Sequence, residues 1–297
     1  MISGRLRSLI RTDRRRSLLN YPAIVSESSC SLPESLQDQF HIRVVPHSVN
    51  INGQEYVEGI NITDADLRKL LHANTGKVTT SAVNPRLLAE TFESILRQDR
   101  SVIFVGLPPR FSCTLQNAQI ARQMCSRPER IFIYDGKCIG INLGKLAMAA
   151  SQLADSGRTP DFIISQLDLL RQRMVSALWS SDMSAIVNNG RANELLKRFA
   201  SVISIHPVLT LTPDGAPQLI RLTRTLAQGI DALIDFIKAR GMAPGEVLCI
   251  GHFESPAAAA QLAAKAREQL GTEQIVILEG GNLLYLHLGA GSLSVSI

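Results

Sequence analysis

Residues 102–134 read VIFVGLPPRFSCTLQNAQIARQMCSRPERIFIY, and this stretch decides the fold. Val102–Val105 is a short apolar run of β-branched and aromatic residues, which is typical of a strand buried on both faces. Ser112–Met124 follows with the character of a helix, and Ile131–Tyr134 is a second buried strand. A strand, a helix and a strand in this order predict two parallel strands joined by a helical crossover, the repeating unit of an α/β sheet.

The same alternation continues on both sides of this unit. The further predicted elements are a strand at 23–25, a hairpin within 41–57 that turns at Asn52-Gly53, and helices at 85–96 and 143–153. Residues 21–160 are therefore predicted to form an N-terminal domain with a doubly wound parallel sheet.

The pattern changes after residue 160. The expected elements are a long helix at 161–178, antiparallel strands within 208–222 joined at Pro213-Asp214-Gly215, helices at 226–239 and 257–270, strands at 247–250 and 275–278, and a terminal pair of strands. In this interpretation His287 lies where a strand runs into the turn Gly289-Ala290-Gly291. Residues 161–297 are predicted to form a C-terminal α+β domain with a mixed sheet, separated from the first domain near residue 160.

The composition is that of a folded globular chain. Of its 297 residues 45% are hydrophobic and 19% charged, and the net charge is +5. Residues 1–20 carry six arginines and one aspartate, which accounts for the whole excess. The remaining chain is neutral, and this argues against a nucleic-acid-binding domain, in which the basic charge would form part of the fold.

Residues 1–20 are predicted to be a basic N-terminal extension. Arg14-Arg15-Arg16 resembles a twin-arginine signal, but polar residues follow where an apolar segment should be. Leu6, Leu9 and Ile10 lie at nearly helical spacing, which leaves transient contact with a membrane surface as an alternative to a solvated extension. No apolar run approaches the roughly 18 residues that a membrane span needs.

The cysteines and most histidines give no sign of a metal site. The five cysteines are far apart and include no C-x-x-C pair, so we expect no zinc and reduced thiols in a cytoplasmic protein. His41, His47 and His72 have no partner at the spacing of metal ligands and are expected to be surface or turn residues.

Hydroxyl-rich segments follow or precede the predicted elements at the edge where an open α/β sheet binds its ligands. These segments are Ser26-Glu27-Ser28-Ser29, Thr79-Thr80-Ser81 and Ser112-Cys113-Thr114, together with Asp135-Gly136. Hydroxyls and free N–H groups at helix starts suit an anion without requiring a cation, although helix capping explains part of the pattern.

An enzyme remains the alternative. Ser112 or Cys113 as a nucleophile with His287 as a base would act on a small acyl or anionic substrate, and His252 is a second candidate base for Cys113. Against this reading, no G-x-S-x-G motif occurs and no acidic residue is evident to orient the histidine.

Ordered motifs from about Tyr21 to Ile297 resemble the DegV family, the bacterial two-domain fatty-acid-binding proteins that present acyl chains to a fatty acid kinase. The matching segments are Ile24–Ser29 with Leu32-Pro33, Thr80-Ser81, Ser112-Cys113-Thr114, Asn189-Gly190-Arg191, His206-Pro207, Asp214-Gly215, Arg224, His252 and His287–Gly291. Several of these depart from the family pattern: Cys113 stands in place of a glycine, His206 of a lysine, Ala290 of a proline and Asn189 of a glycine.

The resemblance implies a long-chain fatty acid in a tunnel between the two domains and no cofactor. Hydroxyls at Thr80 and Ser112 would bind its carboxylate, with His287 and Arg224 beside it at the surface where a kinase docks. The full set of ligand-binding residues that the resemblance implies is Thr80, Ser81, Ser112, Cys113, Thr114, Arg224 and His287. A non-enzymatic carrier is therefore the leading hypothesis. Besides the enzyme, the second alternative is a regulatory protein with a vestigial pocket that uses residues 1–20 to contact a membrane or a partner.

Overall fold

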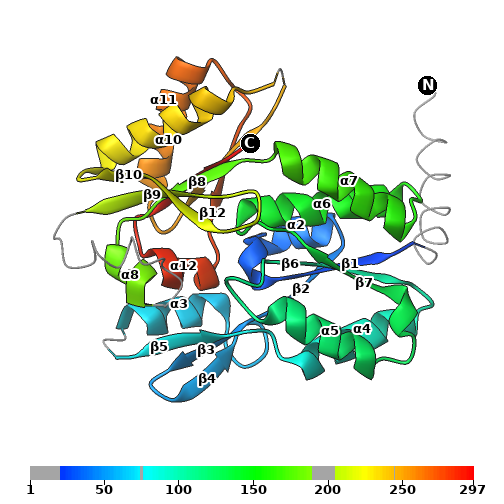
Figure 1. Cartoon of the computed structure of the whole chain (residues 1–297). Helices are drawn as coiled ribbons and strands as arrows, with labels where there is room; N and C mark the ends of the chain where they lie inside the picture. The colour runs from blue at the N-terminus through cyan, green and yellow to red at the C-terminus, as the bar shows by residue number, and fades with distance from the viewer. Residues whose placement is uncertain (1–20, 74–75, 189–204, 244) are drawn as a thin grey trace, which may run out of the picture.

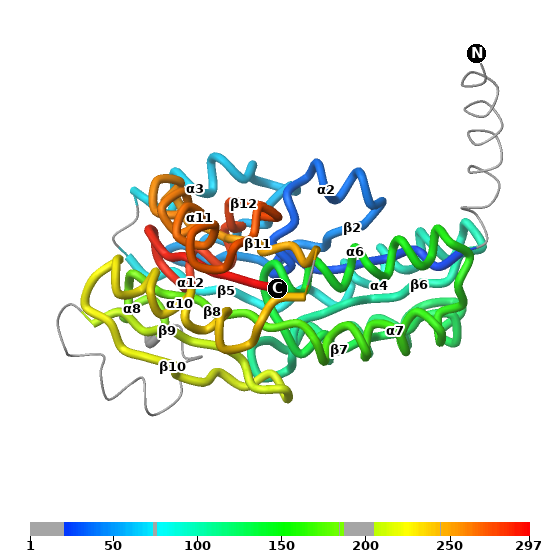
Figure 2. The backbone as a smooth tube through the Cα atoms, turned by 90° about the horizontal axis from the view of Figure 1, so that it is seen from above, coloured from blue at the N-terminus to red at the C-terminus, as the bar shows by residue number. Residues whose placement is uncertain are grey.

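The computed structural model describes residues 21–73, 76–188, 205–243 and 245–297, and it contains three sheets (Figure 1). The predicted extension at 1–20 and the motif Asn189-Gly190-Arg191 lie outside these ranges. Figure 2 shows the six-stranded sheet and its helices on one side of the molecule, and the helices of the four-stranded sheet on the other.

The first sheet contains four parallel strands in the order β2-β1-β6-β7. Their bounds are β1 Ala23–Glu27, β2 Ile42–Val45, β6 Val102–Gly106 and β7 Ile131–Asp135. Every residue of β1 and β6 is buried, as the apolar runs predict.

Helices cover both faces of this sheet. They are α2 Glu34–Gln39, α4 Pro85–Leu96, α5 Thr114–Met124, α6 Ile141–Asp155 and α7 Pro160–Arg173, with two short 3₁₀ helices, η2 Ser28–Cys30 and η3 Pro128–Arg130. In Figure 1, α6 and α7 lie above the sheet, and α4 and α5 lie below it. Separate apolar cores form on the two faces. The predicted doubly wound domain is confirmed.

A small antiparallel sheet, β4-β3-β5, branches from this domain. Its elements are β3 Ser48–Ile51, β4 Gln54–Val57 and β5 Val78–Ser81, with α3 Asp64–Ala73 packed alongside. The predicted hairpin at Asn52-Gly53 is confirmed, since β3 and β4 pair on either side of it. Asn52 adopts a φ of 53° and Gly53 of 92°, the left-handed conformations that such a turn requires.

The third sheet has six strands in the order β10-β9-β8-β13-β11-β12, and its one parallel pair is β11 with β12. The strands are β8 Ser176–Trp179, β9 His206–Leu211, β10 Pro217–Thr223, β11 Leu248–His252, β12 Ile275–Glu279 and β13 Leu293–Ser296. Helices α10 Leu226–Arg240 and α11 Pro256–Leu270 bury an apolar core against it, and α8 Met183–Asn188 and α12 Asn282–Leu288 complete the elements. The predicted mixed sheet is confirmed.

The sequence prediction was wrong about the end of the helix that starts after Thr159. It was expected to run to Leu178, but α7 ends at Arg173 and residues 176–179 form β8. Pairing of Ala177 with Val295 and with Thr210 places this segment between two strands, and these long-range contacts outweigh its local preference. The boundary near residue 160 stays a prediction; α7, which follows it, packs on α6 over the first sheet.

The prediction was also wrong about the segment that carries His287. A terminal strand was expected to run into the turn at Gly289-Ala290-Gly291, but residues 282–288 form α12. The buried leucines are Leu283, Leu284 and Leu288, which is the spacing of one helical face. His287 therefore lies in the last turn of a short helix.

Candidate functional site

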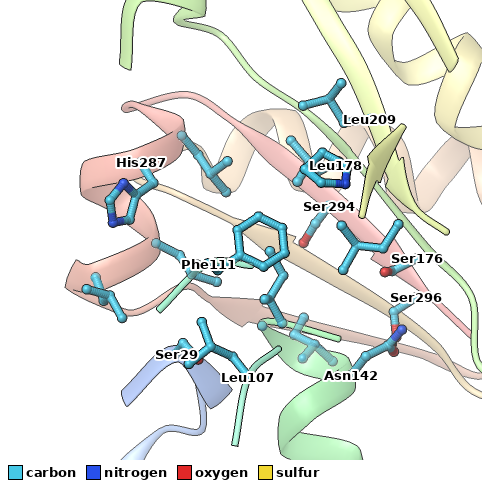
Figure 3. A pocket seen from close by; sticks show the side chains of 18 of the residues that line it. Ser29, Leu107, Phe111, Asn142, Ser176, Leu178, Leu209, His287, Ser294 and Ser296 are labelled. Atoms are coloured by element: carbon cyan, nitrogen blue, oxygen red, sulfur yellow. The ribbon is translucent and has the colours of Figure 1, made fainter. Parts of the chain in front are cut away.

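A cavity lies between the first and third sheets and is lined by residues from both (Figure 3). Its volume is about 140 Å³. The loop after β6 and the start of α6 form one wall, and strands β8, β9 and β13 form the opposite wall together with α12. Segments far apart in the sequence thus enclose one space.

The middle of the cavity is apolar. Leu178 and Leu209 face it from the third sheet, and Leu107 and Phe111 face it from the loop after β6 (Figure 3). The other apolar lining residues are Ile139, Ile141, Ala177, Ile186, Leu211, Pro217, Phe253, Leu283, Leu284, Leu288 and Val295. Such a lining suits a hydrocarbon chain, since it offers contact without polar groups to desolvate.

Hydroxyls and an imidazole gather at one end of this cavity. Thr80 on β5, Ser112 after β6 and His287 on α12 all line it, and all three are half-buried. Thr80 Oγ1 lies 3.3 Å from His287 Nε2. The family resemblance implied this grouping, and the fold brings the three residues to the same cavity.

Thr114 stands directly behind Ser112. The two hydroxyl oxygens are 2.8 Å apart, and the backbone N–H of Thr114 donates to Ser112 Oγ at 3.2 Å. Thr114 is fully buried and does not itself line the cavity. Its Oγ1 lies 3.1 Å from Nε2 of His47, so Thr114 links Ser112 to a buried histidine.

His47 was expected at the surface, and that expectation was wrong. It is 5% exposed, lines the cavity, and its Nδ1 lies 3.3 Å from Oε2 of Glu27. The polypeptide between β2 and β3 turns inward here, with the backbone N–H of His47 donating to Ser28 Oγ. The sequence signal was the acidic residue at the end of a buried strand, where a carboxylate requires partners.

Glu27 is a fully buried carboxylate with three protein donors besides this histidine. Ser29 donates through its backbone N–H at 3.0 Å and its hydroxyl at 2.7 Å, and the N–H of Leu107 donates at 3.0 Å. These bonds offset the cost of burying the carboxylate and hold the ends of β1 and β6 together.

The opposite end of the cavity is also polar, and two of its hydroxyls donate to neighbouring groups of the protein. Ser296 donates to Asn142 Oδ1 at 2.6 Å, and Thr210 donates to the carbonyl of Ser176 at 2.7 Å. In Figure 3, Ser296, Asn142 and Ser176 lie away from His287, with Phe111 between the two ends. The hydroxyl protons of Ser296 and Thr210 are thus already used within the protein.

Three of the predicted ligand-binding residues lie elsewhere. Ser81 and Cys113 are exposed and do not belong to the lining. Arg224 is exposed just before α10, and among the residues described the cavity lining does not include it. Cys113 has a φ of −77°, which any residue adopts. The backbone at this position therefore does not require the glycine of the family pattern.

We expect a thiol reagent to label one cysteine of the native protein rapidly, and that cysteine is Cys113. It is the exposed one of five free thiols, whereas Cys30, Cys125, Cys138 and Cys249 are buried. Burial raises the pKa of Cys30 to about 12, so its reactive thiolate is scarce at neutral pH. Counting the thiols that react before and after unfolding checks this, with Cys113→Ser as the control.

A catalytic Cys113 would lose its labelling when the cavity is filled. We expect no such protection, because Cys113 does not line the cavity. Protection by an added fatty acid would contradict this placement and would favour the enzyme hypothesis.

Within the described ranges, no helix is long and apolar enough to cross a membrane. No group of three or more histidines, cysteines and carboxylates in these ranges could hold a metal ion.

The fold and the cavity define a two-unit α/β protein with a largely apolar site between the units. The model of the DegV family, described as uncharacterised proteins, matches residues 22–297, and the chain belongs to this family. A DegV domain-containing protein of Caldanaerobacter subterraneus is 28% identical over 275 residues, which is 92% of this chain and 97% of that one. A relative from Streptomyces coelicolor is 27% identical and covers 93% of this chain and 97% of its own length.

Solved structures share the fold. A DegV family protein of Thermus thermophilus, described by its fatty acid binding, superposes with a TM-score of 0.82 at 21% identity, covering 93% of this chain and 98% of that one. A fatty-acid-binding DegV protein of Streptococcus agalactiae gives 0.81 at 22%, with the same coverage. A stearic acid-binding protein of Eubacterium ventriosum gives 0.81 at 18%, covering 93% and 97%.

Proposed function

We propose that this protein is a non-enzymatic carrier that binds a long-chain fatty acid in the cavity between its two units. One observation carries the proposal: an apolar cavity between the sheets has hydroxyls and an imidazole gathered at one end. This is the shape and polarity of a molecule with a hydrocarbon chain and a single polar head. The fatty acids named for its structural neighbours support the same ligand class.

The carboxylate of the ligand would lie at the end formed by Thr80, Ser112 and His287. A buried carboxylate needs several donors to offset its desolvation, and hydroxyls and imidazole N–H groups are such donors. The lining described contains no lysine or arginine, so hydrogen bonds rather than a permanent charge would hold the head group.

The acyl chain would extend along the apolar wall towards Leu178 and Leu209. Each buried methylene group contributes about 0.8 kcal/mol, so the chain supplies most of the affinity. This path would be the tunnel that the family resemblance implies, and the position of its far end would set the preferred chain length.

Presentation to a fatty acid kinase would follow from the position of the head-group end. Thr80, Ser112 and His287 are half-buried rather than enclosed, so a bound carboxylate would lie close to solvent. A phosphoryl donor on a partner protein could then reach it while the chain stays buried. A cytoplasmic location, inferred from the scattered reduced cysteines, stays a prediction.

Mass spectrometry of an organic extract of the purified protein tests the proposal. We expect a fatty acid in about equal amount to the protein, and we expect added oleic acid to raise the unfolding temperature of delipidated protein, because a ligand that binds the folded state stabilises it. Extracts without lipid in repeated preparations, together with no thermal shift, would overturn the proposal.

A further inference from the structure

The buried pair Glu27 and His47 stands behind the hydroxyls at the head-group end of the cavity. We propose that His47, held by Glu27, determines which head group this end accepts, and that a fatty acid binds as an ionised carboxylate together with a proton on His47. The inference rests on the proposed function and deepens it, since it assigns a specificity-determining residue to the same site.

The chain of polar atoms runs from the carboxylate to the cavity in three short steps. Glu27 Oε2 lies 3.3 Å from His47 Nδ1, His47 Nε2 lies 3.1 Å from Thr114 Oγ1, and Thr114 Oγ1 lies 2.8 Å from Ser112 Oγ. Nδ1 also lies 3.2 Å from Oγ of Ser28, which already accepts from the backbone N–H of His47. Because a carboxylate only accepts hydrogen bonds, whereas a hydroxyl can accept as well as donate, we place a proton on Nδ1, facing Glu27 and Ser28. The state of Nε2 then decides the direction of every bond beyond it.

With neutral His47, the chain of bonds points away from the ligand. Nε2 accepts from the hydroxyl of Thr114, whose oxygen in turn accepts from the hydroxyl of Ser112. The single hydroxyl proton of Ser112 is then donated to Thr114, and only the lone pairs of the Ser112 oxygen face the cavity. A carboxylate placed there would face another acceptor. Turning that proton to the ligand would leave the two oxygens, 2.8 Å apart, without a proton between them.

With protonated His47, every bond in the chain reverses. Nε2 donates to Thr114, Thr114 donates to Ser112, and the hydroxyl proton of Ser112 becomes available to the ligand. No hydrogen bond is lost, and the carboxylate gains a donor as well as a positive charge two hydroxyls away. When a protonated fatty acid enters, its O–H bond breaks and the N–H bond of His47 forms, so the proton is conserved.

The surroundings favour this charge. Glu27 on β1 is the acidic group in contact with His47, and Cys30 on the adjacent η2 is neutral because burial raises the pKa of its thiol. Across the cavity α12 contributes His287, a second titratable group. Ser28 and Thr114 are uncharged. The charged imidazole would thus pair with Glu27 on one side and, through the hydroxyls, with the ligand on the other.

Affinity for a fatty acid should then depend on pH. The bound carboxylate raises the pKa of His47, so binding is strongest below the pKa of the free protein's imidazole, down to the pH at which the fatty acid itself protonates. Binding weakens as the pH rises through the window between the pKa values of the free and bound forms, by up to about tenfold per pH unit. A neutral fatty alcohol needs no such proton and should show no such dependence.

Calorimetric titration with oleic acid at pH 6.5 and pH 8.5 tests the inference. Titrations in two buffers of different ionisation heat also count the protons taken up. We expect the dissociation constant of the wild type to rise at least about tenfold between these values, with nearly one proton taken up per ligand at pH 8.5. His47→Gln should abolish both effects, and oleyl alcohol should show neither in either protein.

Two variants separate the possible sources of the proton. His287→Gln removes the other imidazole at this end, and proton uptake should persist in it. His41→Asn removes an exposed histidine at the other end of β2 and should bind like the wild type; asparagine suits its φ of 51°. Proton uptake that is lost in His287→Gln and kept in His47→Gln would overturn the assignment.

A measurement on the wild type covers the case in which His47→Gln does not fold. The proton resonances of the His47 ring, titrated with and without oleic acid, should show a higher pKa in the complex, and the ¹³C-labelled carboxyl of the ligand should show the shift of a carboxylate at pH 7. An unchanged His47 titration or a protonated ligand would refute the inference. If the wild type binds no oleic acid at either pH, the proposed function itself fails.

Discussion

Replacing Leu178 by tryptophan is expected to lower the affinity for a long-chain fatty acid by about tenfold or more. Leu178 lies on β8 and lines the apolar middle of the cavity, opposite the loop after β6 (Figure 3). An indole in this position would take the space of about two more methylene groups than leucine does, at the expense of the ligand. At about 0.8 kcal/mol each, their loss removes about 1.6 kcal/mol, which corresponds to roughly fifteenfold in the dissociation constant.

The matched control is Leu169→Trp, which makes the same substitution outside the cavity. Leu169 lies on α7 and its side chain is 54% exposed. This variant should bind like the wild type. A shorter ligand such as octanoic acid, which need not pass Leu178, should lose less affinity in Leu178→Trp than oleic acid does. Equal binding of oleic acid by a folded Leu178→Trp protein would show that the acyl chain takes another path.

The first sheet could be predicted from the sequence because its strands carry a strong local signal. Val102–Val105 and Ile131–Tyr134 are apolar on both faces, and only a strand covered by helices on both sides satisfies that pattern. The hairpin at Asn52-Gly53 was equally clear, since few sequences adopt the required left-handed turn. Where one local rule dominates, the sequence is sufficient.

Elements whose form depends on distant partners could not be predicted in this way. The alternating leucines of α12 fit a strand and a short helix equally well, and packing of Leu283, Leu284 and Leu288 decides between them. Residues 176–179 likewise continue a helical pattern, and pairing with β13, more than a hundred residues away, makes them a strand.

The candidate site shows the same division. Motif order pointed to Thr80, Ser112 and His287, and the fold brings all three to one cavity. Alternation along β5 explains why Ser81 is not with them: Thr80 is half-buried, whereas its neighbours on the strand, Thr79 and Ser81, are exposed.

Glu27 and His47 escaped sequence reasoning for a different reason. They lie 20 residues apart, on either side of α2 and β2, and no spacing rule connects them. The contact of His47 with Thr114 spans 67 residues. A buried acid can be suspected from its place at the end of an apolar strand, but its partner appears only when the chain is folded.

A second cluster joins α3 to the third sheet and gives a further strong prediction. Arg68 is held between Glu254 at 3.5 Å and Glu279 at 3.6 Å, donates to the side chain of Asn282, and lies over the ring of Tyr285. Asn282 also donates to Asp64 at 2.7 Å, with Glu58 of the β4–α3 connection beside it.

Burial and the neighbouring carboxylate of Asp64 raise the pKa of Glu58 from 4.5 to about 7, while Asn282 and Arg68 partly oppose the shift. A carboxyl with a raised pKa binds its proton more tightly in the folded state. The contribution of Glu58 to the free energy of unfolding therefore falls as the pH rises from about 4.5 to about 7, and it changes no further above pH 7. Allowing for screening of a partly exposed group, the loss is on the order of 2 kcal/mol.

We expect Glu58→Gln to remove this loss, because glutamine keeps the shape of the protonated acid and has no charge to place beside Asp64. Urea unfolding at a series of pH values should show similar stability for the variant and the wild type at pH 4.5, and a variant that is about 2 kcal/mol more stable at pH 8.

Glu55→Gln, an exposed change on β4, is the control and should keep the pH dependence of the wild type. If Glu58→Gln also keeps it, Glu58 is ionised in the folded protein and the cluster does not bind the proton there. The expected gain of the variant at pH 8 means that the Glu58 carboxylate destabilises the folded protein at that pH. It does so within a cluster that connects the small antiparallel sheet and α3 to the unit carrying His287.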